Sequence, residues 1–500
     1  MKHAKGFCQE TRPESCGVVL FGATGDLASR KIIPALFGLV SKKLMPRDFY
    51  LLFVARTPLE PEAFQARIAA ALAGAGFKPS PQEFHAFMAR ASYLRADYGS
   101  DEFYISLKNR LDELDKKSNI SRKRLFYLAT PPAAFEPITE KFRAHRLLYD
   151  PADTAVWSRL IIEKPYGSSL ESACRLDTGL KEKASESQIY RIDHFTGKET
   201  VQNILALRAT NSVFDETWNN RFIDHVQITV FEELGLEGRT AFFERMGLAR
   251  DMMSHFFQLA AVTAMDLPTT FKDSDFKLEK KRFFESIPLF SAGETGELSL
   301  RGQYSASGRT PAGYRNEAGA SPESMTETFL AFKFFVENKR WSGVPFYVRG
   351  GKRMNRKKTK IDVVYKKPAH GMFARSGDDF SNVFTMNIQP EESMFFDLNT
   401  KHPGPRLCFT SRRMKLNYRE HDEEFASPTD YERLLIDAMA GDQTLFLSAF
   451  EMEFMWSFVS PMLETWAVNP GSAPLLFYPG GSAGPEEAAA FINKDGRKWL

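Results

Sequence analysis

Residues 188–199 contain the side chains whose types and spacing best suit chemistry. The segment Gln188-Ile-Tyr-Arg-Ile-Asp-His-Phe-Thr-Gly-Lys-Glu199 places Asp193, His194, Lys198 and Glu199 within one short stretch. A histidine can move a proton near neutral pH, a carboxylate can orient it, and lysine and histidine together suit an anion. The segment therefore predicts a site that binds an anion and transfers a proton.

A second proton-transfer candidate lies in Arg250-Asp-Met-Met-Ser-His255. Side chains four residues apart share one face of a helix, so Asp251 and His255 would lie together. Oxidation of an alcohol by hydride transfer requires such a base. A histidine among methionines and phenylalanines is more often a packed core residue, and the spacing alone leaves both interpretations open.

Two further segments offer cations for an anionic ligand. Lys164 follows an expected strand, and the segment 349–358 carries six cationic side chains: Arg349, Lys352, Arg353, Arg356, Lys357 and Lys358. Gly350 and Gly351 favour a close approach of the backbone to a ligand. A solvated face or a nucleic-acid contact would produce the same run of charge, so these alternatives stay open.

A glycine motif near the N-terminus predicts a nucleotide site. It follows an apolar strand and opens a helix, and it consists of Gly22, Ala23, Thr24, Gly25, Asp26, Leu27 and Ala28. Backbone N–H groups in such a turn can cradle a pyrophosphate, whose charge the helix N-terminus favours. The spacing is GxxGxxA rather than GxGxxG, so an ordinary tight turn between strand and helix is the alternative.

The end of the second expected strand indicates which dinucleotide would bind. A site for NAD usually has an acidic side chain there, whereas this chain has Arg56-Thr57 and no acid before Glu60. A guanidinium bonds a phosphate bidentately, so NADP is favoured over NAD. Taken alone, Arg56 is equally consistent with a solvated surface arginine.

The elements that must position these residues fall into two patterns. Up to about residue 190, short apolar runs alternate with helical stretches, which predicts a doubly wound parallel sheet with strands 17–21, 50–55, 124–129 and 160–162 and a helix 27–40. Beyond residue 220 the apolar residues alternate with period two, which predicts mostly antiparallel strands at 225–232, 326–337, 345–349, 361–366, 382–389 and 393–398. Further expected features are helices 250–265 and 430–440, a turn at Asn338-Lys339, and a loop 478–485 before a short C-terminal helix.

Composition limits the class of protein. A chain of 500 residues with 43% hydrophobic content is long enough for two domains, and its net charge of +3 gives no reason to expect nucleic-acid or membrane binding. Cys8, Cys16, Cys174 and Cys408 lack metal-ligand spacing, so we expect a cytoplasmic protein without structural metal. We find neither a secretion signal nor a long apolar segment in the sequence.

The C-terminal segments Gly480-Gly-Ser-Ala-Gly-Pro485 and Asp495-Gly-Arg-Lys-Trp499 resemble the bacterial branch of the glucose-6-phosphate dehydrogenase family, and five motifs, in this order, resemble those of the family as a whole. They are Gly22-Ala-Thr-Gly-Asp-Leu-Ala28, Ile162-Glu-Lys-Pro-Tyr-Gly167, Tyr190-Arg-Ile-Asp-His-Phe-Thr-Gly-Lys-Glu199, Trp341-Ser-Gly-Val-Pro-Phe346 and Asp430-Tyr-Glu-Arg-Leu-Leu435. The resemblance implies an α/β plus α+β fold, with an NADP-binding Rossmann domain at 1–190 and a substrate-binding and dimerisation domain at 191–500. It also implies a homodimer or a dimer of dimers.

The same resemblance implies a reaction, the first step of the oxidative pentose phosphate pathway. Glucose 6-phosphate would be oxidised at C1 to 6-phosphoglucono-1,5-lactone, with reduction of NADP. His255 would be the general base and Asp193 the carboxylate that orients it, which replaces the local pairing of His255 with Asp251. The expected substrate ligands are Glu232 and Asp251 for sugar hydroxyls, His194, Lys198, Lys352 and Lys357 for the phosphate, and Lys164 between substrate and cofactor.

Three positions depart from the family pattern. Phe195 replaces a tyrosine whose hydroxyl helps to hold the phosphate, and loss of one hydrogen bond, worth about 0.5–1.5 kcal/mol, predicts a modest rise in KM. The spacing from Asp251 to His255 is one residue shorter than in the family; because one residue turns a helix by about 100°, either the preceding turn absorbs the change or Asp251 does not make the usual contact. The segment 446–451 lacks a common arginine, and the second NADP site of animal relatives is not expected. A dehydrogenase of another hexose phosphate and an inactive NADP-binding regulatory protein are the alternatives.

Overall fold

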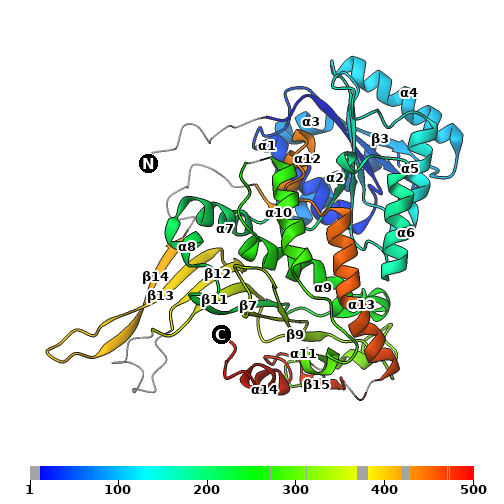
Figure 1. Cartoon of the computed structure of the whole chain (residues 1–500). Coiled ribbons are helices and arrows are strands. Elements are labelled where there is room, and N and C mark those ends of the chain that lie inside the picture. Colours follow the sequence, from blue (N-terminus) through cyan, green and yellow to red (C-terminus); the bar gives the residue numbers. More distant parts are fainter. Residues whose placement is uncertain are drawn as a thin grey trace. The chain divides into compact units, whose positions relative to one another are not determined.

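The computed structural model describes residues 12–270, 272–310, 312–368, 381–417, 428–469, 471 and 473–500 (Figure 1). Cys8 lies outside them. The chain forms two compact units. Of the described residues, the first unit comprises 12–167, 171–197 and 428–449, and the second comprises the remainder. The division expected at residue 190 stays a prediction, and the return of segment 428–449 to the first unit was not foreseen.

The first unit is built on a six-stranded, fully parallel sheet in the order β3-β2-β1-β4-β5-β6. Its strands are β1 (Cys16–Phe21), β2 (Phe49–Ala55), β3 (Ala91–Arg95), β4 (Lys123–Leu128), β5 (Trp157–Ile162) and β6 (Ile189–Arg191). This order confirms the predicted doubly wound architecture. It reverses between β1 and β4, and such sheets bind ligands beyond the carboxyl ends of the strands at that point.

The helices of the first unit include one from late in the sequence. The elements are η1 (Ala28–Ile32), α1 (Ile33–Ser41), α2 (Pro61–Gly74), α3 (Pro81–Met88), α4 (Asp101–Lys117), η2 (Pro132–Ala134), α5 (Phe135–Ala144), α6 (Leu170–Lys181), η3 (Glu186–Gln188) and α12 (Asp430–Ala440). The predicted helix 27–40 is a π-helical turn, η1, followed by α1. Helix α12 buries Leu434, Leu435 and Ala438 in the core of this unit, and Glu432 pairs with Lys42 at 2.6 Å.

The second unit contains a nine-stranded sheet in the order β14-β13-β12-β11-β7-β10-β9-β8-β15. The strands are β7 (Ile223–Phe231), β8 (Ser299–Ser305), β9 (Phe329–Phe335), β10 (Pro345–Gly351), β11 (Lys358–Tyr365), β12 (Val383–Gln389), β13 (Ser393–Lys401), β14 (Phe409–Asn417) and β15 (Leu475–Pro479). Among the described strands of this sheet, only β7 with β10 and β8 with β15 pair in parallel, so the mostly antiparallel sheet is confirmed. The turn expected at Asn338-Lys339 is a longer connection, 336–344.

Helix α9 (Thr240–Ala264) packs on the central strands β7, β9 and β10 (Figure 1). Phe257 of α9 contacts the rings of Phe332, Phe334 and Phe458, so the apolar residues of this helix pack in the core of the second unit. Gly247 (φ 66°, ψ 172°) interrupts α9, and the predicted helix 250–265 corresponds to the part of α9 that follows this break. The other helices are α7 (Glu199–Thr210), α8 (Ser212–Thr217), α10 (Asp273–Glu285), α11 (Thr295–Leu298), η4 (Tyr314–Asn316), α13 (Ala449–Val468) and α14 (Glu487–Asn493). Within the described ranges, no helix has the length and apolarity to cross a membrane.

Candidate functional site

The glycine motif forms a turn at the carboxyl end of β1, at the switch point of the parallel sheet. Gly22 has φ +77°, and a Cβ on it would lie 2.2 Å from the carbonyl oxygen of Ala129. The Gly25 N–H donates to Gly22 O at 2.9 Å, and the helical turn begins at the next residue, Asp26. Such a turn brings backbone close to a ligand at a helix N-terminus, so the motif fits the pyrophosphate of a dinucleotide.

Arg56 lies where it was expected, at the end of β2 and exposed to solvent. Its neighbour Thr57 is 3.4 Å from Thr24, hydroxyl to hydroxyl, so this end of β2 lies beside the glycine turn. A second cation, Arg67 of α2, donates to the carbonyl oxygen of Thr24. Cationic side chains lie next to the glycine turn, and the end of β2 carries no acidic side chain. Both features fit an adenosine 2′-phosphate.

Lys164 and Asp193 meet at the carboxyl ends of the neighbouring strands β5 and β6. Lys164 Nζ lies 3.4 Å from Asp193 Oδ2, and the peptide between Lys164 and Pro165 is cis. Asp193 is fully buried and accepts the Phe195 N–H at 3.0 Å, so its carboxylate has a fixed orientation. A buried carboxylate beside a lysine can hold the lysine toward a ligand at this edge of the sheet.

His194 and Phe195 follow directly, and Lys198 precedes helix α7. The His194 ring is half-buried and meets the buried Phe195 ring edge-on, with centroids 4.9 Å apart. Lys198 is half-buried, and its carbonyl oxygen accepts the Val201 and Gln202 N–H groups in the first turn of α7. The structure assigns His194 to the first unit and Lys198 to the second. Their joint grip on a phosphate stays a prediction.

The second unit brings three predicted substrate ligands together from three elements. Lys352 follows β10, Glu232 follows β7, and Asp251 lies on α9. Lys352 Nζ is 2.6 Å from Glu232 Oε2 and 3.5 Å from Asp251 Oδ2. Burial alone would lower the pKa of Lys352, but the charges of Asp251 and Glu232 outweigh it and raise that pKa. The lysine is therefore cationic and holds two half-exposed carboxylates in place.

His255 lies on the same helix as Asp251, one turn further along, and is 4% exposed. Side chains four residues apart share a helix face, so His255 and Asp251 point to the same side of α9. His255 belongs to the second unit and Asp193 to the first. The orientation of His255 by Asp193 therefore stays a prediction.

The basic segment 349–358 does not form one solvated face. Arg349 and Lys352 are buried, whereas Arg356 and Lys357 are exposed in the loop before β11. Burial lowers the pKa of Arg349 to about 10, and its guanidinium stacks on Trp499 at 4.3 Å. Lys352 is thus the member that the fold directs to the carboxylates, and a role for Lys357 stays a prediction.

Comparison with known proteins agrees with this geometry. Residues 19–203 match the family model described as glucose-6-phosphate dehydrogenase, NAD binding domain, and residues 205–500 match the C-terminal domain of the same family. The chain belongs to the glucose-6-phosphate dehydrogenase family. This is a family of oxidoreductases with a nicotinamide dinucleotide-binding domain, and the predicted resemblance is confirmed.

Individual relatives match over nearly their whole length. Glucose-6-phosphate 1-dehydrogenase of Chlamydia pneumoniae is 38% identical over 496 residues, which cover 97% of this chain and 96% of the relative. The enzyme of the same name from Bacillus subtilis is 36% identical over 488 residues, with 96% and 97% covered. A solved structure of glucose-6-phosphate dehydrogenase in complex with glucose 6-phosphate has a TM-score of 0.90 at 30% identity, covering 98% and 99% of the two chains.

Sequence reasoning missed several residues that shape these sites. Tyr98 accepts the Gly22 N–H at 3.1 Å, and Arg67 binds the same turn. Phe243 lies 5.1 Å from Lys352 Nζ, ring centroid to nitrogen. Each comes from an element distant in sequence, and no spacing pattern connects it to its partner.

Proposed function

We propose that this chain oxidises glucose 6-phosphate at C1 to 6-phosphoglucono-1,5-lactone with transfer of a hydride to NADP, the first step of the oxidative pentose phosphate pathway. The observation that carries the proposal is the cluster of Glu232, Asp251 and Lys352 in a chain whose two family matches together span residues 19–203 and 205–500. Two fixed carboxylates suit the hydroxyls of a sugar, because carboxylates accept strong hydrogen bonds.

The cofactor would lie on the glycine turn of residues 22–27. Backbone N–H groups at the helix N-terminus bind the pyrophosphate, and Arg56 binds the 2′-phosphate. Lys164, held by Asp193, reaches toward both substrate and cofactor. When bound, NADP accepts the hydride that leaves C1.

The substrate would be held at both ends. His194 and Lys198, helped by Lys352 and Lys357, bind the phosphate, and Phe195 leaves that set of ligands without the tyrosine hydroxyl that the family resemblance implies. Glu232 and Asp251 accept hydrogen bonds from the sugar hydroxyls, and their fixed places come from Lys352.

His255 would take the proton from the C1 hydroxyl as the hydride leaves C1, so that one proton and one hydride are removed and a C=O bond forms. A neutral imidazole performs this step near neutral pH. Asp193 is the proposed partner that orients the ring, as the resemblance implies.

The test is a panel of hexose phosphates assayed with NADP and with NAD, by following absorbance at 340 nm. The proposal predicts the highest kcat/KM for glucose 6-phosphate with NADP. A higher value for another hexose phosphate would favour the first alternative, and NADP binding without turnover on any of them would favour the inactive regulatory protein.

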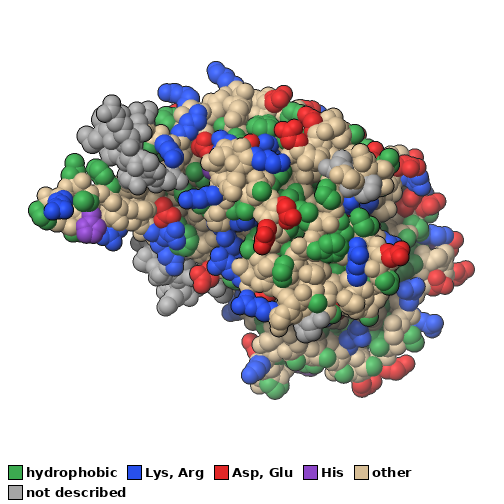
Figure 2. All heavy atoms as spheres, turned by 90° about the horizontal axis from the view of Figure 1, so that it is seen from below, with side chains coloured by type: hydrophobic (Ala, Val, Ile, Leu, Met, Phe, Trp, Pro, Cys, Tyr) green, Lys and Arg blue, Asp and Glu red, His purple; other side chains and the backbone are tan. Residues whose placement is uncertain are grey.

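We also propose a cytoplasmic homodimer, or a dimer of such dimers, formed through the sheet of the second unit. Strand β14 is at the edge of that sheet and exposes Met414 and Leu416, at 62% and 51%. Strands β13 and β14 form a hairpin, and Figure 2 shows hydrophobic side chains on it. Exposed apolar side chains on an edge strand favour pairing with a second chain. Light scattering that gives the mass of a monomer at micromolar concentration would contradict this assembly.

A further inference from the structure

The segment of α9 that carries Asp251 and His255 has a separate beginning and is anchored at both ends. It starts at Leu248, after the break at Gly247, and ends at Ala264. The first N–H groups and last C=O groups of any helix lack partners within it. Here buried charged side chains from other elements of the same unit supply partners at both ends.

Glu327, just ahead of β9, holds the N-terminal end. The Leu248 N–H donates to the Glu327 backbone oxygen at 3.1 Å, and the Ala249 N–H donates to Glu327 Oε1 at 2.9 Å. Glu327 is 4% exposed, and a Cβ at Gly247 would come within 2.4 Å of Oε1. The glycine therefore permits the close approach of this carboxylate to the helix.

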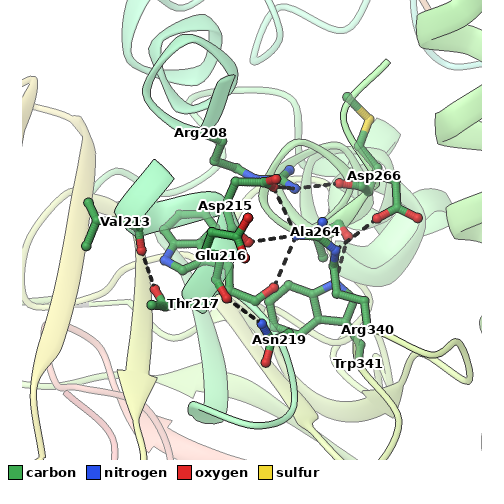
Figure 3. A network of polar contacts seen from close by, with 12 residues as sticks. Arg208, Val213, Asp215, Glu216, Thr217, Asn219, Ala264, Asp266, Arg340 and Trp341 are labelled. Carbon is green, nitrogen blue, oxygen red and sulfur yellow. Dashed lines mark hydrogen bonds and ion pairs between the residues drawn. The ribbon is translucent and has the colours of Figure 1, made fainter. Parts of the chain in front are cut away.

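Arg208 of α7 holds the C-terminal end. It donates from Nη1 to Val262 O at 3.1 Å and from Nη2 to Met265 O at 2.7 Å, and it is 1% exposed. The Trp341 indole N–H donates to Ala264 O at 2.7 Å, and Arg340 pairs with Asp266 at 2.9 Å (Figure 3). Burial lowers the pKa of Arg208 to about 10, which leaves it charged at neutral pH.

Burial raises the pKa of the Glu327 carboxyl; in its ionised form this side chain, like the Arg208 guanidinium at the other end, carries the charge that the helix dipole favours. An anion at the N-terminus and a cation at the C-terminus are each favourable. Burying a charge is nevertheless costly, and a neutral cap would satisfy the same backbone groups. The contacts at both ends oppose sliding of the helix along its axis and rotation about that axis.

We propose that Glu327 and Arg208 are positioning residues that set the axial place and the rotation of His255 and Asp251. This inference rests on the proposed function, in which His255 accepts the C1 proton. A slip of one residue would move a side chain by 1.5 Å along the axis and turn it by about 100°. A misplacement of about 1 Å can lower a rate about 100-fold, so small losses of anchoring are measurable as turnover.

The test compares Glu327→Ala and Glu327→Gln with Glu432→Ala. Glutamine keeps an amide oxygen that can accept the Ala249 N–H, whereas alanine removes it. Glu432 is an equally buried glutamate that caps α12, which carries none of the proposed site residues. For each variant we would measure kcat, KM for NADP, and the isotope effect on kcat with glucose 6-phosphate deuterated at C1.

We expect Glu327→Ala to lower kcat at least tenfold with KM for NADP within twofold, and to raise the isotope effect because hydride transfer becomes slower. Glu327→Gln should recover most of kcat. A smaller folded fraction would lower the rate without changing the isotope effect. A kcat for Glu327→Ala equal to that of Glu432→Ala, or an unchanged isotope effect, would overturn the proposal.

Hydrogen exchange separates this inference from the proposed function. In Glu327→Ala, but not in Glu432→Ala, amides of residues 248–256 should lose protection. A wild-type protein that does not oxidise glucose 6-phosphate overturns the proposed function, whereas unchanged protection in Glu327→Ala overturns the anchoring of the helix.

Discussion

Replacing Lys352 with methionine tests the carboxylate cluster most directly. The substitution keeps an unbranched side chain of similar length and removes the charge that Glu232 and Asp251 share. Because Nζ lies 2.6 Å from one carboxylate oxygen and 3.5 Å from the other, the two oxygens are at most about 6 Å apart. Without the lysine, these carboxylates repel each other across that distance.

The size of the effect follows from Coulomb's law. Two unit charges about 6 Å apart repel by about 3 kcal/mol at an effective dielectric of about 20, and by about 0.7 kcal/mol in bulk water. The two side chains are 37% and 36% exposed, so solvent screens them substantially. We take about 1–2 kcal/mol, which corresponds to a rise of about 5–30-fold in KM for glucose 6-phosphate.

The assay is steady-state reduction of NADP at varied glucose 6-phosphate, at a temperature where the variant is folded by circular dichroism. Lys360→Met is the matched control, because Lys360 is also buried and pairs with a single carboxylate, Asp362, at 2.7 Å. The control should keep KM for glucose 6-phosphate within twofold. A folded Lys352→Met with an unchanged KM for the sugar would refute the reasoning.

Three further predictions concern the base, the cofactor and pH. His255→Asn should lower kcat by about 100-fold or more with little change in KM, and near-normal turnover would exclude His255 as the base. Arg56→Ala should raise KM for NADP about tenfold or more and leave KM for NAD unchanged, and equal effects would contradict the 2′-phosphate role. Burial raises the pKa of Glu163 from 4.5 to about 7. The folded state then binds the proton more tightly, so stability falls by about 3 kcal/mol as pH rises through that window. The thermal midpoint of Glu163→Gln should therefore decrease less between pH 4.5 and 7 than that of the wild type. An identical pH dependence of the two midpoints would disprove the prediction.

Strands were predictable where burial on both faces left a continuous apolar run. Strand β2, Phe49–Ala55, is buried throughout and was expected nearly as observed. Strand β3, Ala91–Arg95, is at a sheet edge with no fully buried residue, and β14 is an exposed edge strand with several cations. Neither strand has a continuous apolar run or a regular alternation of apolar and polar residues. An edge strand pairs with one neighbour only and is partly exposed, so its sequence needs neither pattern.

The site was predictable to the extent that its residues stand in local motifs. The glycine turn and Lys164 follow predicted strands directly, so their shared edge could be inferred from the strand pattern, whereas the short strand β6 before Asp193 was not predicted. The contacts of Lys352 with Glu232 and Asp251 depend on the pairing of β7 with β10 and on the rotation of α9. Strand pairing and helix rotation are features of the tertiary structure that no local motif specifies. Only the family resemblance indicated that these three residues belong to one site.

The spacing between Asp251 and His255, one residue shorter than the family resemblance implies, falls within the helical segment that follows the break at Gly247. In an uninterrupted helix it would turn one of the two side chains by about 100° relative to the elements packed before it. The break at Gly247 separates the rotation of the following segment from the preceding turns, and Glu327 sets that rotation anew at Leu248 and Ala249. In this segment Asp251 Oδ2 lies 3.5 Å from Lys352 Nζ. Four residues correspond to about 400°, so His255 points within about 40° of Asp251. The spacing of four residues therefore places the proposed base and the proposed hydroxyl ligand on one helix face, and the contact of Asp251 with the sugar stays a prediction.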